Sequence, residues 1–239
     1  MEERLTIYEG INEAVLSLIP QSAVRILDVG CGTGSLGKYL LQDSQRYVAG
    51  ITYSEEEAAI AASRLSQVVC AELNDFDFSL LGKFDCVILS HVLEHMYSPG
   101  SVLERLKRVL RPESVIVVAL PNVVWWKQRI QFLLGRWRYQ DWGVLDRTHF
   151  RFFDRESAEQ LLEGSGYEIL KRRFDGPFPL IKPVRGLIGR WAIKIDRATS
   201  TCVPGLLAFQ FAFVARPRDA QSGSGTNSKT IEKDDNGRG

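Results

Sequence analysis

One short stretch does most to limit the fold: residues 26–37, which read ILDVGCGTGSLG. Its first residues are mostly apolar, which predicts a buried strand, and its glycines predict a tight turn that opens a helix. A strand, a glycine loop and a helix place backbone N–H groups and a helix N-terminus at the carboxyl edge of a sheet. The stretch therefore predicts an α/β fold with a ligand-binding loop at that edge.

Short apolar runs that predict strands alternate with helical segments along the rest of the chain. The predicted strands are 24–29, 46–52, 67–71, 84–90, 114–120, 167–174 and 206–216. The predicted helices are 2–18, 35–42, 54–65, 99–110, 155–164 and 182–199. Ser54 is the expected N-cap of the third helix, with Glu57 at the capping-box position. Strands separated by helices indicate a doubly wound, mostly parallel sheet with helices on both faces.

Chain length and composition set the domain organisation. The chain has 239 residues, which is enough for one core with insertions. We expect a single domain over residues 1–216, with lid-like insertions at 122–150 and 175–203. Residues 217–239 are polar and almost free of aliphatic side chains, which predicts a disordered tail.

Cysteine usage and charge exclude several classes of protein. The four cysteines lack the spacing of a metal site, and we expect all of them to be buried thiols in a reducing compartment: Cys31, Cys70, Cys86 and Cys202. The net charge of +1 does not favour a nucleic-acid partner. The chain shows neither a signal-peptide pattern at its first residues nor an apolar run of about 18 residues, so we expect a cytoplasmic protein.

Two glycine registers overlap in the predicted loop. Residues 32–37 spell G-x-G-x-x-G, the dinucleotide fingerprint, and residues 28–34 spell D-x-G-x-G-x-G. The first register leaves Asp28 without a role and requires an acidic residue where the chain has Thr52. In the second register, the Asp28 carboxylate can receive a cationic ammonium group, directly or through water. S-adenosylmethionine carries such a group in its amino-acid end, so this register favours S-adenosylmethionine as the cofactor.

Three sequence blocks carry a resemblance to a known family. They are ILDVGCGTG in the first strand, FDCVILSHVLEH in the fourth and RLKRVLRPESVIVVALPN in the fifth. From about residue 24 to 174 the chain resembles the class I S-adenosylmethionine-dependent methyltransferases. LSHVLEHM is similar to the UbiG-type quinone methyltransferases, and PNVVWWKQRIQFLLGRWRYQ to the MetW-type proteins of methionine biosynthesis. The resemblance implies a Rossmann-like seven-stranded sheet of order 3-2-1-4-5-7-6 with the last strand antiparallel.

The resemblance also implies which residues would contact the cofactor. The acidic residue that usually binds the ribose is replaced by Thr52, which Tyr53 follows, and some cyclopropane-synthase-type relatives share this threonine. Glu72, with Asp75 as the competing choice, would accept the adenine amino group, and the backbone N–H of Leu73 would reach the ring. The expected cofactor-binding residues are Asp28, Gly30, Gly32, Gly34, Thr52, Tyr53, Glu72, Leu73, Ser90 and His91.

Methyl transfer to a hydroxyl requires alignment of the acceptor with the methyl group and removal of the hydroxyl proton, for which histidine is a common base. The chain has three histidines. His149 lies in the lid-like segment, where we expect a base or substrate contact, or else a loop-packing residue. His95 follows Glu94 and is either a second catalytic candidate or a residue that packs the next helix. His91 could equally be a capping or core histidine. No metal site is expected.

The expected activity is S-adenosylmethionine-dependent methyl transfer to an oxygen of a small or lipid-linked acceptor. The alternative is a cofactor-binding partner subunit without activity of its own, which the MetW resemblance and Thr52 motivate. No nucleic-acid substrate is expected, since no N-P-P-[YF] tetrapeptide is present. Residues 182–197 carry apolar and basic side chains at helical spacing, which indicates either a packed lid helix with a solvated basic rim or a surface for peripheral membrane contact.

Overall fold

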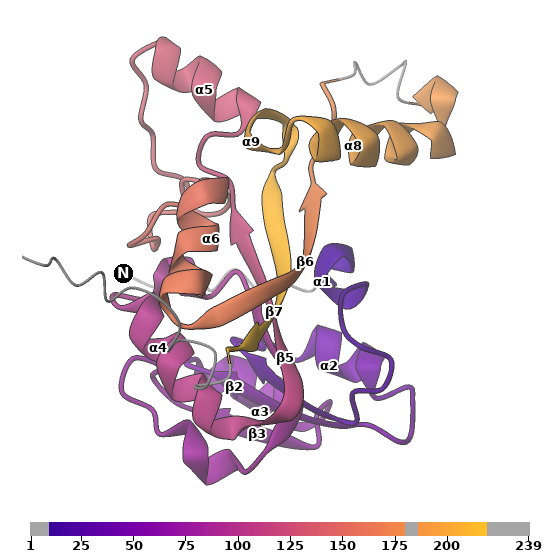
Figure 1. Cartoon of the computed structure of the whole chain (residues 1–239), viewed down its shortest axis with the longest axis vertical. Coiled ribbons are helices and arrows are strands. Elements are labelled where there is room, and N and C mark those ends of the chain that lie inside the picture. Colours follow the sequence, from indigo (N-terminus) through magenta and orange to yellow (C-terminus); the bar gives the residue numbers. More distant parts are fainter. Residues whose placement is uncertain (1–9, 180–185, 219–239) are drawn as a thin grey trace, which may run out of the picture.

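The computed structural model describes residues 10–179 and 186–218, and their core is a seven-stranded sheet (Figure 1). The strands are β1 (Arg25–Val29), β2 (Tyr47–Thr52), β3 (Gln67–Cys70), β4 (Phe84–Ser90), β5 (Leu110–Pro121), β6 (Tyr167–Asp175) and β7 (Gln210–Pro217). Their order is β3-β2-β1-β4-β5-β7-β6, and β7 runs antiparallel to both of its neighbours. The predicted fold class and strand order are confirmed.

The sheet is covered on both faces because its strands alternate their apolar side chains between two cores. In β4, Val87 and Leu89 face one core while Cys86 and Ile88 face the other. The first core also takes side chains from η1 (Phe78–Leu81), η2 (Leu93–His95), α4 (Pro99–Leu106), η3 (Lys107–Val109) and α6 (Arg155–Gly164). The second takes side chains from α1 (Glu13–Leu16), α2 (Ser35–Leu40) and α3 (Glu55–Ala62). This is the doubly wound arrangement that buried parallel strands require.

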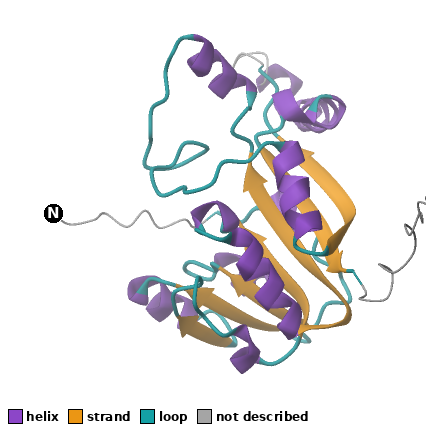
Figure 2. Cartoon of the chain, turned by 60° about the vertical axis from the view of Figure 1, so that its left-hand side comes forward, coloured by secondary structure: helices purple, strands orange, loops and turns teal. Residues whose placement is uncertain are grey.

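The insertions gather at one end of the molecule. Helices α5 (Trp126–Leu133), α8 (Arg190–Cys202) and α9 (Pro204–Leu207) lie together beyond the ends of β6 and β7 (Figure 1). Trp125, which precedes α5, is buried and packs edge-on against Phe209, which precedes β7. The loop between α5 and α6 stands away from the sheet (Figure 2). None of the described helices is long and apolar enough to cross a bilayer.

The N-terminal segment is tied to the carboxyl edge of the sheet through Asn12. The Asn12 Oδ1 accepts hydrogen bonds from the backbone N–H groups of Ala14 and Val15, which starts α1. Its Nδ2 donates to Ser90 Oγ at 3.3 Å and to Gln210 Oε1 at 2.9 Å. The helix predicted at 2–18 is therefore only Glu13–Leu16 in the described chain, because Asn12 caps it there; residues 1–9 lie outside the described residues.

Two other expectations need correction. Cys70 and Cys202 are exposed rather than buried, since β3 is an edge strand and α8 projects beyond the sheet. The strand predicted from residue 206 begins at Gln210, because the Pro204–Leu207 helix precedes it. The predicted helix at 182–199 corresponds to α8, and its residues 182–185, like the tail from 219, lie outside the described residues.

Candidate active site

The glycine loop after β1 follows the D-x-G-x-G-x-G register. Gly30, Gly32 and Gly34 all have positive φ, at 75°, 53° and 79°, which L-residues rarely adopt. The backbone N–H groups of Gly30 and Cys31 both donate to the Ile51 carbonyl at 2.9 Å, which ties the loop to the end of β2. The loop conformation therefore depends on these three glycines.

The space around each glycine differs. A Cβ at Gly30 would lie 2.5 Å from the Val92 side chain, so this position is closed by packing. At Gly32, the only atoms within 4 Å of an added Cβ belong to the Glu57 carboxylate, the nearer at 3.7 Å. At Gly37, a Cβ would lie 2.3 Å from Leu65. Gly32 therefore faces nearly open space, whereas Gly37, the third glycine of the dinucleotide register, is required for packing.

Asp28 lies in β1 below this loop and is only 3% exposed. Within the described part of the chain, no hydrogen bond reaches its carboxylate. Burial raises the pKa of Asp28 to about 7. A buried carboxylate without a partner is destabilised in its charged form, so a ligand cation is the missing partner that it fits.

The end of β2 reveals a carboxylate that the sequence pattern did not identify. Thr52 is buried, and its hydroxyl donates to Glu57 Oε2 at 2.7 Å. The backbone N–H of Glu57 is bound by the Ser54 hydroxyl, so the predicted N-cap is confirmed. The Glu57 side chain does not return to Ser54 as a capping box requires; it turns to Thr52 and the glycine loop. Thr52 thus holds an acidic group beside Gly32.

The loop after β3 carries the residues expected near adenine. Glu72 is exposed, and its Oε1 accepts hydrogen bonds from the backbone and side chain of Asn74. Leu73 is buried. The Arg105 guanidinium donates to the backbone carbonyls of Leu73, Asn74 and Phe76, at 2.9, 2.6 and 2.7 Å. This arginine of α4 fixes the loop. Asp75, the competing choice, is exposed, as is Tyr53 after β2.

His91 follows β4 with a positive φ of 57°, which is unusual for a residue with a side chain. Its Nδ1 lies 3.2 Å from Glu94 Oε1, and its Nε2 lies 2.8 Å from Gln210 Oε1. Burial lowers the pKa of His91, but the hydrogen bond and charge of Glu94, together with Gln210, outweigh it and raise the pKa above its ordinary value. Both ring nitrogens are therefore engaged by the protein, and His91 links β4 to β7.

His95 and His149, expected to have separate roles, lie together. Their ring centroids are 4.7 Å apart with the rings edge to face. The loop that carries His149 is fastened to η2, because the backbone N–H groups of Phe150 and Arg151 donate to the Glu94 carbonyl at 2.9 and 3.1 Å. Burial lowers the pKa of His149 below its ordinary value. The two imidazoles form one unit beside the carboxyl end of β4.

The aromatic segment expected to form a single lid divides into two parts. Trp125 is buried and anchors the segment, and the backbone of Phe150 and Arg151 is fastened to η2 by the Glu94 carbonyl. In contrast, Trp137 and Trp142 are 48% and 63% exposed on the projecting loop. The part near the sheet edge can contact an acceptor, while the outer part presents aromatic rings to its surroundings.

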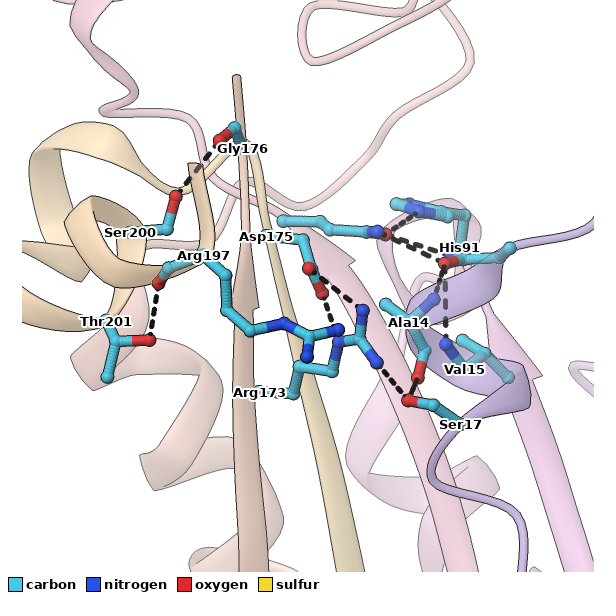
Figure 3. A network of polar contacts seen from close by, with 12 residues as sticks. Ala14, Val15, Ser17, His91, Arg173, Asp175, Gly176, Arg197, Ser200 and Thr201 are labelled. Carbon is cyan, nitrogen blue, oxygen red and sulfur yellow. Dashed lines mark hydrogen bonds and ion pairs between the residues drawn. The ribbon is translucent and has the colours of Figure 1, made fainter. Parts of the chain in front are cut away.

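A hollow of about 530 Å³ opens next to His91 at the carboxyl edge of the sheet. Residues of α1, the end of β6 and α8 line it together with Gln210. Figure 3 shows Arg173, Asp175 and Arg197 lying together on one side of this region, with His91 and α1 on the other. Arg173 Nε forms an ion pair with Asp175 at 2.7 Å, and Arg173 also donates to Ser17. The hollow thus offers basic, acidic and apolar groups beside the end of β4.

Comparison with known proteins identifies the protein family to which the chain belongs. Residues 4–172 match the family model described as a methyltransferase domain. The chain belongs to the methyltransferase domain family. The expected membership of the class I S-adenosylmethionine-dependent methyltransferases is confirmed, and the cofactor of this methyltransferase domain is S-adenosylmethionine. The UbiG-like or MetW-like subtype stays a prediction.

Several curated proteins are similar to the methyltransferase domain. A probable S-adenosylmethionine-dependent methyltransferase of Mycolicibacterium smegmatis is 31% identical over 145 residues, which are 60% of this chain and 52% of that protein. O-methyltransferase cnsE of Penicillium expansum is 32% identical over 124 residues, 49% of this chain and 43% of that protein. A ubiquinone biosynthesis O-methyltransferase of Neisseria meningitidis is 26% identical over 105 residues, 41% and 44% of the two chains. The chain spans about half the length of these curated relatives.

Solved structures share the fold of the methyltransferase domain. A S-adenosylmethionine-dependent methyltransferase of Archaeoglobus fulgidus superposes with a TM-score of 0.56 at 21% identity, over 82% of this chain and 86% of that chain. The PH0226 protein of Pyrococcus horikoshii gives a TM-score of 0.57 at 15% identity, over 86% and 87% of the two chains. At these identities the likeness concerns the fold alone.

The described residues of the methyltransferase domain fit this cofactor. The open side of Gly32 leaves room where a Cβ would intrude, and the buried, unpaired Asp28 suits the ammonium of the amino-acid end. Sequence reasoning missed Glu57, Gln210 and Asn12. The one local signal for Glu57 was its place five residues after Thr52, in the first turn of the helix that leaves β2. Gln210 and Asn12 are distant in sequence from β4, and no local pattern marks them.

Proposed function

We propose that the chain transfers the methyl group of S-adenosylmethionine to an oxygen of an acceptor that enters the hollow beside His91. The observation that carries the proposal is the position of this hollow. It shares His91 with the end of β4, and the residue after His91, Val92, packs against Gly30 of the cofactor loop. The names of the similar O-methyltransferases support oxygen as the acceptor atom. The partner-subunit alternative has no comparable support.

In this reaction, the residues of the chain would mainly position the cofactor and the acceptor. S-adenosylmethionine supplies a methyl group already activated on a sulfonium, so the protein mainly excludes water and aligns the acceptor oxygen. Asp28 would hold the ammonium, and the glycine loop would face the amino-acid end. Glu57 would accept hydrogen bonds from the ribose hydroxyls in place of the acidic residue that Thr52 replaces. Glu72 and the Leu73 N–H would contact the adenine, and Ser90 and His91 close the site at β4.

The exposed surface around the site supports an apolar or lipid-linked acceptor. Large apolar side chains are exposed on α5, on the loop after it, and in and just before α8; Figure 1 places α5 and α8 at the same end of the molecule. They are Ile130, Leu133, Leu134, Trp137, Trp142, Leu187, Trp191 and Ile193. Basic side chains lie among them: Lys127, Arg129, Arg136, Arg138, Arg190 and Lys194. Apolar side chains with a basic surround suit contact with an anionic lipid surface.

The role of Glu57 leads to a quantitative prediction. We expect Glu57→Ala to weaken S-adenosylhomocysteine binding by about 10-fold or more, since a charge-assisted hydrogen bond contributes about 1.5–3 kcal/mol. Calorimetric titration measures this change. The 2′,3′-dideoxyribose analogue of S-adenosylhomocysteine should bind the Glu57→Ala variant and the parent with nearly equal affinity, because it lacks both hydroxyls that would donate to Glu57.

Glu56→Ala is the matched control, because Glu56 lies in the same helical turn and is exposed. Its affinity for S-adenosylhomocysteine should equal that of the parent. If Glu57→Ala weakens the natural ligand and the dideoxy analogue by the same factor, the ribose assignment is wrong.

The proposed function is tested with purified full chain, methyl-labelled S-adenosylmethionine and a cell extract separated into lipid, small-molecule and macromolecular fractions. We expect label as an O-methyl group in the lipid or small-molecule fraction. Arg197→Ala, which changes the lining of the hollow, should raise the KM for that acceptor and leave S-adenosylhomocysteine binding unchanged. Label confined to protein or nucleic acid would contradict the acceptor class. Transfer that requires an added protein fraction would instead support the partner-subunit alternative.

A further inference from the structure

Three metal-ligating side chains meet beside the carboxyl end of β4. Glu94, His95 and His149 each present one ligand atom, and these atoms lie within 4.8 Å of one another. Glu94 and His95 belong to η2, whereas His149 arrives on the loop that follows α5. The spacing in the sequence gave no sign of this set, because only the packing of the loop on η2 brings His149 to the pair.

The hydrogen bonds of both imidazoles leave the same nitrogen available. His149 Nδ1 lies 3.2 Å from the Val144 carbonyl oxygen, and His95 Nδ1 lies 3.3 Å from the Thr148 carbonyl oxygen. A carbonyl oxygen only accepts, so each Nδ1 carries the proton and each Nε2 of a neutral ring has a free lone pair. Backbone carbonyls that orient the second nitrogen in this way are typical of histidines that bind metal ions.

Thr148 and Asp146 extend the hydrogen-bond network around His95. Thr148 Oγ1 donates to Asp146 Oδ1 at 2.7 Å and accepts from His95 Nδ1 at 3.0 Å. Asp146 is buried and also accepts from the Thr148 backbone N–H at 2.8 Å. This chain of a carboxylate, a hydroxyl and an imidazole holds the ring in place and increases the basicity of its Nε2.

The third group, Glu94, provides independent support. Its side chain is fully buried, and its Oε1 is held by His91. Its Oε2 is buried and has no hydrogen-bond partner among the described residues. A buried carboxylate oxygen without a partner is unfavourable unless a ligand supplies one. The neighbours that could share such a ligand are the imidazoles of His95 and His149.

We propose that Glu94, His95 and His149 bind a divalent transition-metal ion of the zinc class. Two imidazoles and one carboxylate are a ligand set that such ions prefer, and three protein ligands leave a coordination position open. Tetrahedral bonds of about 2.1 Å place ligand atoms about 3.4 Å from one another, so binding of the ion would draw these three side chains slightly closer together. On the proposed function, the open position takes the acceptor oxygen and lowers its pKa; binding of the ion does not depend on that role.

The test measures Zn²⁺ affinity of the metal-stripped full chain by competition with a chromophoric chelator. The parent carries Cys70→Ser and Cys202→Ser, because these two exposed thiols could bind Zn²⁺ themselves. We expect one tightly bound ion per chain, and Co²⁺ should give the visible absorption of a low-coordinate imidazole and carboxylate site. Glu94→Gln and His149→Ala should each weaken Zn²⁺ binding by about 100-fold or more, and Thr148→Val by about 10-fold.

Glu104→Gln is the matched control, since Glu104 is exposed and forms a surface ion pair with Lys107 in the described part of the chain. Its Zn²⁺ affinity should equal that of the parent. Unchanged melting temperature and S-adenosylhomocysteine affinity of the metal-free Glu94→Gln and Thr148→Val variants show that they fold. Absence of stoichiometric binding by the parent, or Zn²⁺ affinities of Glu94→Gln and His149→Ala within about threefold of it, overturns the inference. Methyl transfer by a parent protein that binds no Zn²⁺ would leave the proposed function standing, whereas Zn²⁺ binding without methyl transfer would leave the metal site standing.

Discussion

We expect Gly32→Val to abolish the binding of S-adenosylhomocysteine while the protein remains folded. Gly32 has a φ of 53°, and the nearest atom to an added Cβ is the Glu57 carboxylate at 3.7 Å. A side chain there has room within the protein and projects into the space that the cofactor needs. Strain at the positive φ should lower the free energy of unfolding by about 1–3 kcal/mol. The affinity for S-adenosylhomocysteine should fall by at least about 100-fold, which calorimetry and thermal-shift titration measure.

Gly37→Ala provides the contrast, because its Cβ would lie 2.3 Å from Leu65 and 3.0 Å from Val48. Overpacking of this kind lowers stability by about 1–3 kcal/mol. Both variants therefore lose similar stability, but only Gly32→Val should lose the cofactor. If Gly37→Ala lost cofactor affinity and Gly32→Val kept it, the D-x-G-x-G-x-G assignment of the loop would be wrong.

The second large effect concerns pH. Burial raises the pKa of Asp28 to about 7 in the free protein, and the cofactor ammonium should lower it again. Below pH 7, binding must then release a proton, so affinity for S-adenosylhomocysteine should fall by up to tenfold per pH unit. Between pH 7.5 and pH 5.5 we expect a loss of roughly 25-fold. Asp28→Asn should bind weakly at pH 7.5 and show little change of affinity over this range.

Stability should respond to pH in the opposite sense. The folded pKa of Asp28 lies above the unfolded value of 3.8, so the contribution of this group to stability is fully present below pH 4. It is lost as pH rises toward 7. Without cofactor, Asp28→Asn should therefore melt at a higher temperature than the parent at pH 8 while binding the cofactor more weakly. A variant that melts lower and binds normally would show that Asp28 is a structural residue.

The clustered histidines show a contact that a local sequence pattern does not predict. The motif around residues 84–95 correctly indicated a strand at the ligand edge. It did not show that His149 would join His95, or that Glu94 would be left with a buried, unpartnered oxygen. The same limit applies to Cys70, whose apolar strand suggested burial although the strand lies at the edge of the sheet.

The sequence by itself determined the order of strands and helices, the glycine loop and Asp28 beneath it. These features depend on apolar periodicity and on backbone conformations that only glycine adopts easily, and both are encoded over a few neighbouring residues. The tertiary structure decided which side chains meet: Glu57 with Thr52, Gln210 with His91 and Asn12, and His149 with His95 and Glu94. Apart from the pairing of Glu57 with Thr52, these contacts join segments far apart in the chain. They exist because a parallel sheet brings the ends of β4 and β5, and the start of β7, to one edge.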